Sequence, residues 1–163
     1  MIGVPTVEAV FRYPVKSMLG TQVEQAEVLA SGLAADRGWA LVDLQTGKVA
    51  SAKQPRLWRS LLQLRAEYHG GDGPADAVGA VTITLPDGTA VRAGEPGTDD
   101  VLSEFAGRPV ALRHGRLPGT GIDRAVPEEV LAHGVGADVA FESLELSQQP
   151  HTGQAHDAPQ ARP

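Results

Sequence analysis

Alternating hydrophobic and polar residues predict short β-strands along the first two thirds of the chain. Val7, Ala9, Phe11 and Tyr13 alternate with the polar residues Glu8 and Arg12, and Pro14 ends this run because proline cannot donate to a strand ladder. The same period-2 pattern or a short apolar run predicts further strands over residues 23–29, 39–43, 49–52, 62–68, 81–85, 90–93 and 109–113. Turns containing glycine or proline separate these segments, as in a chain of hairpins.

Helical spacing is confined to two short segments. Thr98 followed by Asp99 and Asp100 is typical of a helix start, and Gly107 is placed to end that helix. Residues 127–131 predict a second short helix. The expected fold class is therefore mainly β, a small antiparallel β barrel with one or two short helices.

Composition supports many turns and a core of small aliphatic side chains. The 163 residues include 19 glycines and 12 prolines, whereas aromatic residues make up only 4%. Residues 148–163 contain no large apolar side chain and cannot bury enough surface to offset the entropy of ordering them. We therefore expect a disordered tail over 148–163.

Charge is distributed unevenly along the chain. Residues 1–65 contain eight basic and five acidic residues, a net charge of +3, while residues 66–163 carry a net charge of −9. The acidic total and the few aromatic residues argue against a nucleic-acid partner. The basic first half suits one small anionic ligand, although a solvated surface of uneven charge explains the same numbers.

Other classes of site and location find little support. The sequence contains no cysteine, so thiolate metal ligands and thiol catalysis are excluded for these residues. The five histidines lack the i, i+4 spacing of a helical metal pair. No apolar run approaches the roughly 18 residues of a membrane span, and no signal peptide is evident. We expect a cytoplasmic protein without a membrane partner.

Candidate chemistry lies where basic and hydroxyl side chains follow strand ends. Lys16 and Ser17 come just after Pro14, where we expect an unpaired backbone N–H, and Arg37 precedes the predicted strand 39–43. A lysine, a hydroxyl and unpaired amides together make an anion cradle, to which an arginine adds a bidentate donor. The alternative is that Lys16 is solvated at a strand end and that Arg37 pairs with Asp36.

Three motifs in order resemble a known family. They are Tyr13-Pro-Val-Lys-Ser17, Gly32-Leu33 followed by Asp36-Arg37-Gly-Trp39, and Thr46-Gly47 followed by Pro55-Arg-Leu57. The sequence resembles the MOSC N-terminal β-barrel domain, found in amidoxime-reducing molybdenum enzymes and in the C-terminal part of molybdenum-cofactor sulfurases. The resemblance extends from about Val7 to Leu62 and more weakly to Arg113. It implies that Lys16, Ser17 and Arg37 contact the phosphate region of molybdopterin.

The resemblance also sets the expected domain organisation and function. We expect the barrel domain over 1–113, a linker and the start of a truncated MOSC core over 114–147, and the tail beyond. The family holds its molybdenum with a cysteine of the MOSC catalytic domain, so the predicted function is cofactor binding without catalysis by this chain alone. A MOSC catalytic domain in cis or in trans would complete an oxidoreductase or a sulfur-transfer protein. The alternative is a catalytically inert β-barrel module for protein interaction.

Overall fold

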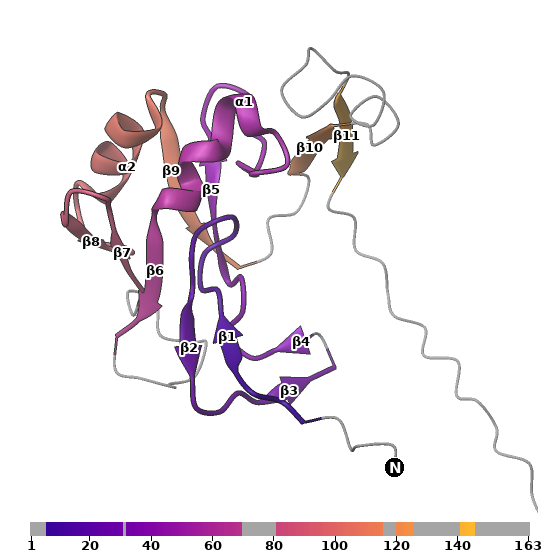
Figure 1. The fold of residues 1–163 in the computed structure, drawn as a ribbon. Helices are drawn as coiled ribbons and strands as arrows, with labels where there is room; N and C mark the ends of the chain where they lie inside the picture. Colours follow the sequence, from indigo (N-terminus) through magenta and orange to yellow (C-terminus); the bar gives the residue numbers. More distant parts are fainter. Residues whose placement is uncertain (1–5, 31, 70–80, 116–119, 126–140, 146–163) are drawn as a thin grey trace, which may run out of the picture.

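A computed structural model describes residues 6–30, 32–69, 81–115, 120–125 and 141–145 (Figure 1). Short strands dominate, with one two-turn helix and shorter helical turns between them. In chain order the elements are β1 Val10–Arg12, β2 Thr21–Val23, β3 Val28–Leu29, β4 Gly32–Leu33, β5 Trp39–Asp43, α1 Pro55–Trp58, the 3-10 helix η1 Arg59–Gln63, β6 Arg65–Tyr68, β7 Val81–Thr84, β8 Ala90–Arg92, α2 Thr98–Ala106, β9 Val110–His114, β10 Gly121–Ala125 and β11 Phe141–Glu145.

Every strand ladder of the described residues is antiparallel, which confirms the mainly β fold class with short helices. The ladders pair β1 with β2, β3 with β4, β5 with β9 and β10 with β11, and order β6, β7 and β8 in one three-stranded sheet. Isolated bridges connect these ladders, such as the parallel bridges from Val15 to Trp39 and from Leu19 to Arg65. The chain segment between β1 and β2 is therefore attached to both β5 and β6.

The hydrophobic core lies between these ladders and α2. Fully buried side chains come from every part of the domain, including Val15, Leu41, Leu64, Ile83 and Leu102. α2 packs on β9 and β8, and its Leu102 points into the core. Both tryptophans, at 39 and 58, are buried in this core. Among the described residues, no helix is long and apolar enough to cross a membrane.

The strand predictions were correct where turn signals enclosed them. The hairpin of β7 and β8 and the strand β5 lie within the predicted ranges, and Gly47, in the turn after β5, has a positive φ of 69°. The predicted strand over 23–29 is wrong in its middle, since β2 ends at Val23 and β3 begins only at Val28. Residues 49–52 form no strand, because only Val49 makes an isolated bridge, to Val42.

Helical structure before β6 was not predicted. The range 62–68 reads as one alternating strand, but α1 and η1 occupy residues 55–63 and β6 begins at Arg65. Leu61 and Leu64 are both fully buried while Leu62 is 51% exposed, so the buried positions here follow a three-residue spacing. Pro55 occupies the first position of α1, where its missing N–H costs nothing.

α2 differs from expectation at its first residue. Gly97, with φ of 83°, is the N-cap, and Thr98 is already helical. The Thr98 hydroxyl donates to the carbonyl oxygen of Arg92 at 2.6 Å and so attaches the helix to β8. Gly107 ends the helix with a φ of 68°, as predicted. The predicted helix over 127–131 and the tail over 148–163 lie outside the described residues.

Candidate functional site

The segment that carries Lys16 and Ser17 is attached to the start of β5. The Lys16 N–H donates to the carbonyl oxygen of Trp39 at 2.9 Å, and the Trp39 N–H donates to that of Pro14 at 3.0 Å. The Lys16 N–H is therefore paired, and the unpaired N–H expected around Lys16 and Ser17 is not at Lys16. These two bonds place Lys16 beside the turn that precedes Trp39, although more than twenty residues separate them in sequence.

Arg37 lies in that turn, and the backbone of Tyr13 holds the turn through two hydrogen bonds, one to the backbone of Arg37 and one to the side chain of Asp36. The Arg37 N–H donates to the Tyr13 carbonyl oxygen at 2.6 Å, and the Tyr13 N–H donates to Oδ1 of Asp36 at 2.8 Å. The hydroxyl of Tyr68 donates to the carbonyl oxygen of Ala35 at 2.9 Å. The turn is thus fixed to Tyr13, the residue after β1, on one side and to β6 on the other.

The Arg37 guanidinium is exposed and only weakly engaged. Its Nη1 lies 3.2 Å from Oδ2 of Asp36, and its side chain is 60% exposed. The guanidinium carbon lies 5.7 Å from the centroid of the Tyr13 ring, within reach of a cation–π contact. The pairing with Asp36 that the sequence left open is therefore present, but an exposed pair of this kind contributes less than about 1 kcal/mol. Arg37 remains accessible to an anion.

Ser17 connects this site to a third segment of the chain. Its hydroxyl oxygen accepts the N–H of Ala52 at 3.1 Å, across 35 residues of sequence. The neighbouring Lys53 thereby lies close enough to act on Lys16. Burial, and then the positive charges of Lys53 and Arg37, lower the pKa of Lys16 below its ordinary value. Lys53 is the site residue that the sequence did not reveal.

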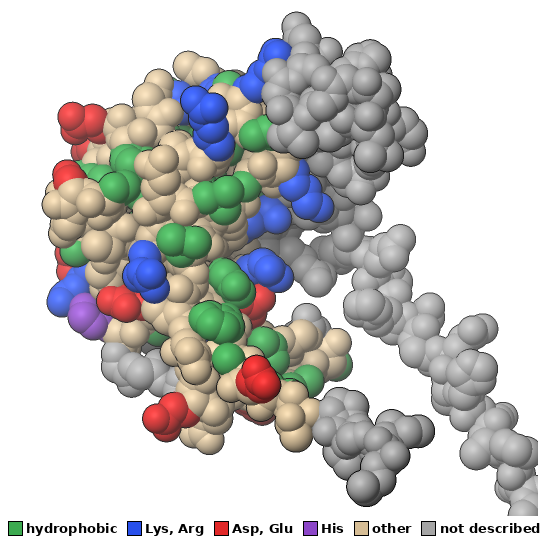
Figure 2. Space-filling view, in the orientation of Figure 1, with side chains coloured by type: hydrophobic (Ala, Val, Ile, Leu, Met, Phe, Trp, Pro, Cys, Tyr) green, Lys and Arg blue, Asp and Glu red, His purple; other side chains and the backbone are tan. Residues whose placement is uncertain are grey.

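Positive charge at this site exceeds negative charge. Within the described residues Asp36 pairs with Arg37, and no ion pair joins Lys16 or Lys53 to a carboxylate. Lys16, Arg37 and Lys53 carry three positive charges and Asp36 carries one negative charge, so these four groups sum to +2. Lys and Arg side chains also gather toward one side of the molecule, on the right of the described surface in Figure 2. We call Lys16, Ser17, Arg37 and Lys53 the basic cradle.

Backbone strain is concentrated at the same place. Among the described residues, three that are not glycine have a positive φ: Ser17 at 63°, Ala35 at 62° and Arg37 at 52°. This conformation costs roughly 1–2 kcal/mol at each residue that carries a Cβ. Such strain persists where the surrounding structure enforces it, commonly at ligand sites. Two of the three strained residues were predicted as site residues, and the third lies in the turn of Arg37.

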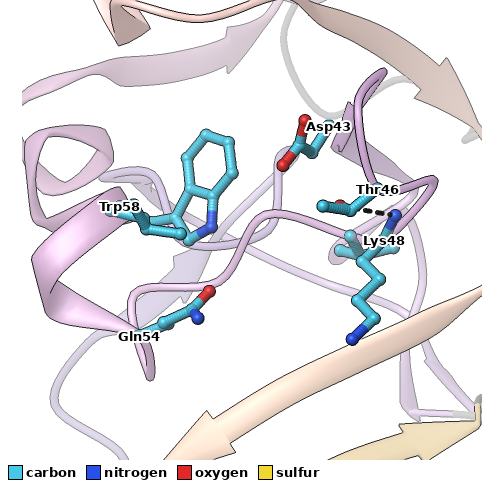
Figure 3. Close-up of a pocket in the computed structure, with 7 residues that line it drawn as sticks. Asp43, Thr46, Lys48, Gln54 and Trp58 are labelled. Carbon is cyan, nitrogen blue, oxygen red and sulfur yellow. Dashed lines mark hydrogen bonds between the residues drawn. The ribbon is translucent and has the colours of Figure 1, made fainter. Parts of the chain in front are cut away.

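A small cleft lies between β5 and α1 (Figure 3). It has a volume of about 80 Å³, and Asp43, Gln54 and Trp58 are among its lining residues, while the Lys48 side chain extends away from the Asp43 carboxylate. Asp43 is buried and already paired, because Nη2 of Arg108 lies 2.8 Å from its Oδ2 and the Gln45 N–H donates to its Oδ1. Among the described residues, the only carboxylate lining this cleft is therefore already used in contacts within the fold.

Metal binding has no support from the described residues, in which no group of three or more His, Cys, Asp or Glu side chains could hold a metal ion. His114 packs against Trp39 instead, with ring centroids 4.7 Å apart. The basic cradle is thus the strongest candidate site in the part of the chain that the structure describes.

Comparison with protein-family models matches residues 4–106 to the MOSC N-terminal beta barrel domain. This range includes all four residues of the basic cradle and the elements from β1 to α2. Searches of the curated proteins and of the solved structures found no match.

Proposed function

The chain belongs to the MOSC N-terminal beta barrel family, and from that membership we propose that it binds the phosphate group of the molybdenum cofactor molybdopterin through Lys16, Ser17 and Arg37. The observation that carries this proposal is the convergence of these residues from two segments into a site of net positive charge. A phosphate monoester carries nearly two negative charges at neutral pH, which the cradle would balance.

Each side chain has a definite part in this proposal. Arg37 is exposed and offers the planar pair of donors that suits phosphate oxygens. Lys16 supplies a half-buried positive charge, which interacts more strongly with an anion than a fully solvated lysine would. The Ser17 hydroxyl accepts the Ala52 N–H with its oxygen, so its hydrogen can be donated to the ligand.

The cofactor chemistry would come from elsewhere. Molybdenum supplies redox or sulfur-transfer chemistry when the cofactor is bound, and the family holds the metal with a cysteine that this sequence lacks. We propose that a MOSC catalytic domain, in cis or in trans, provides that thiolate and the substrate site. The part of this chain is to bind and orient the phosphate end of the cofactor.

The experiment is a titration of the folded chain with molybdopterin cofactor, followed by calorimetry, for wild type and Arg37→Ala. Arg92→Ala is a matched control, because Arg92 is also an exposed arginine paired with a nearby carboxylate, that of Glu95 at 3.7 Å, but lies on β8. We expect Arg37→Ala to weaken binding about tenfold and Arg92→Ala to leave it unchanged. A folded wild-type chain that does not bind would instead favour the protein-interaction module.

A further inference from the structure

The loop that carries Lys53 is fixed against the basic cradle by hydrogen bonds. Besides the bond from the Ala52 N–H to Ser17, the Lys53 N–H donates to Oγ of Ser51 at 3.3 Å, and the Gln54 N–H donates to the Ser51 carbonyl oxygen at 2.9 Å. Ser51 is only 2% exposed, so the loop is anchored in the interior. The backbone of Lys53 is therefore held beside Ser17 by hydrogen bonds to the two serine side chains.

We propose that Lys53 is a further anion-binding residue of the cradle, that it gives the site its preference for a doubly charged phosphate, and that Ser17 positions it. The proposal rests on the proposed function, because it concerns the same ligand group. The Lys53 side chain is exposed and makes no ion pair with a described residue, so nothing within the described part of the chain competes with a ligand for it.

The charge balance explains why this one lysine would determine specificity. Without Lys53, the charges of Lys16 and Arg37 less that of Asp36 leave +1, which matches a singly charged phosphate diester. With Lys53 the balance is +2, which matches a phosphate monoester. Burial, and then the positive charge of Lys53, lower the pKa of Lys16, and a dianion bound between the two lysines would offset the repulsion between them.

The test compares two simple probes, methyl phosphate and dimethyl phosphate, added to the full chain at pH 7.5 and low salt. Methyl phosphate is mostly doubly charged there, since the second pKa of a phosphate monoester is about 6, whereas dimethyl phosphate carries one charge. Amide chemical shifts in NMR spectra report binding. We expect Lys53→Gln to weaken methyl phosphate binding about fivefold and dimethyl phosphate binding less than twofold, and Lys53→Arg to restore the preference.

Two controls separate this proposal from the proposed function. Lys48→Gln removes a lysine that lines the cleft of Asp43 and Trp58 and should leave both affinities unchanged. If Lys53→Gln binds both probes as wild type does while Lys16→Gln loses them, the role of Lys53 is disproved and the cradle stands. If the wild type binds neither probe, the proposed function fails as well.

The positioning role of Ser17 needs a readout beyond lost affinity. We expect Ser17→Ala to speed hydrogen exchange at the Ala52 amide, which loses its acceptor. In that background the further change Lys53→Gln should weaken methyl phosphate binding by less than twofold, because Lys53 is no longer held at the site. Ser17→Gly, which relieves the positive φ, tests the same point if the alanine variant is unstable. A full fivefold loss in both backgrounds would contradict the positioning role.

Discussion

Lys16 lies half-buried beside two other cations, in a position that destabilises the unliganded protein. Burial and the charges of Lys53 and Arg37 lower its pKa from the ordinary 10.5, so the folded chain binds its proton less tightly than the unfolded chain does. Lys16 therefore opposes folding at neutral pH. This contribution lessens as the pH rises from the lowered pKa toward 10.5. A residue that costs stability without ligand is typical of a binding site.

Replacing Lys16 by methionine should raise the stability of the unliganded chain and weaken phosphate binding. Removing an unfavourable half-buried charge while keeping the aliphatic stem should stabilise by roughly 0.5 kcal/mol. Thermal melts of both proteins between pH 7 and pH 10 check this. The difference in Tm should shrink with rising pH, because the wild-type lysine loses its charge there. A lower Tm for Lys16→Met at pH 7 would show that Lys16 instead supports the fold.

Arg37 allows strain and charge to be separated. Its φ of 52° penalises any residue with a Cβ, so Arg37→Gly should be more stable than Arg37→Ala by about 0.5–1 kcal/mol, after allowing for the flexibility of glycine in the unfolded chain. Both variants should lose phosphate affinity equally, because both lack the guanidinium. Urea denaturation with a parallel phosphate titration measures both effects. Equal stability of the two variants would mean that the turn relaxes without cost.

The sequence predicted three of the four residues of the cradle but not how they meet. Lys16, Ser17 and Arg37 stood in recognisable motifs, and the structure brings them together; their role in binding stays a prediction. Lys53 lies between the two parts of the third motif, and its proximity to the cradle depends on the hydrogen bond between Ala52 and Ser17. A single contact across 35 residues leaves no periodic signal in a sequence.

At the scale of elements, the sequence predicted those that depend on neighbouring residues, but not those that depend on packing between distant segments. The β7–β8 hairpin was predicted because its alternation and turn residues are contiguous. The helical turns of α1 and η1 were missed, because Leu62 and Leu64 imitate alternation while the core selects Leu61 and Leu64. The pairing of β5 with β9 joins residues more than sixty positions apart and has no local signature.

The β1–β2 hairpin depends on a glycine that lies against the opposite strand. A Cβ added at Gly20 would lie 2.1 Å from the carbonyl oxygen of Arg12. Arg12 is the residue of β1 that pairs with Thr21, the neighbour of Gly20. Backbone cannot move aside cheaply, so Gly20→Ala should destabilise the chain by about 3 kcal/mol. Gly47→Ala is the control, because nothing lies within 4 Å of a Cβ added there. Only the positive φ of 69° should then reduce the stability, by about 1 kcal/mol. Chemical denaturation compares them, and equal losses would contradict a clash at Gly20.

At the scale of the whole molecule, the described core and most of the net negative charge lie in different parts of the chain. The buried core runs from Val15 to Leu112, and the family match covers residues 4–106. Residues 116–163 contribute a net charge of −4 out of the total of −6. The Val49 N–H donates to the Gly121 carbonyl oxygen at 3.0 Å, a contact that links this part to the domain. The later segment thus adds much of the negative charge and little of the described core.

A chain ending at Gly115 should therefore fold and bind phosphate more tightly at low salt. It retains the whole described core and the basic cradle, while its net charge changes from −6 to −2. The long-range repulsion of an anion is therefore reduced. We expect cooperative thermal unfolding and an affinity for methyl phosphate about twofold higher than that of the full chain at 10 mM salt. The two affinities should converge at 150 mM salt, where the screening length falls to about 8 Å. A loss of cooperative unfolding would show that the domain requires residues beyond 115. Weaker binding by a folded short chain would instead show that those residues contribute to the site.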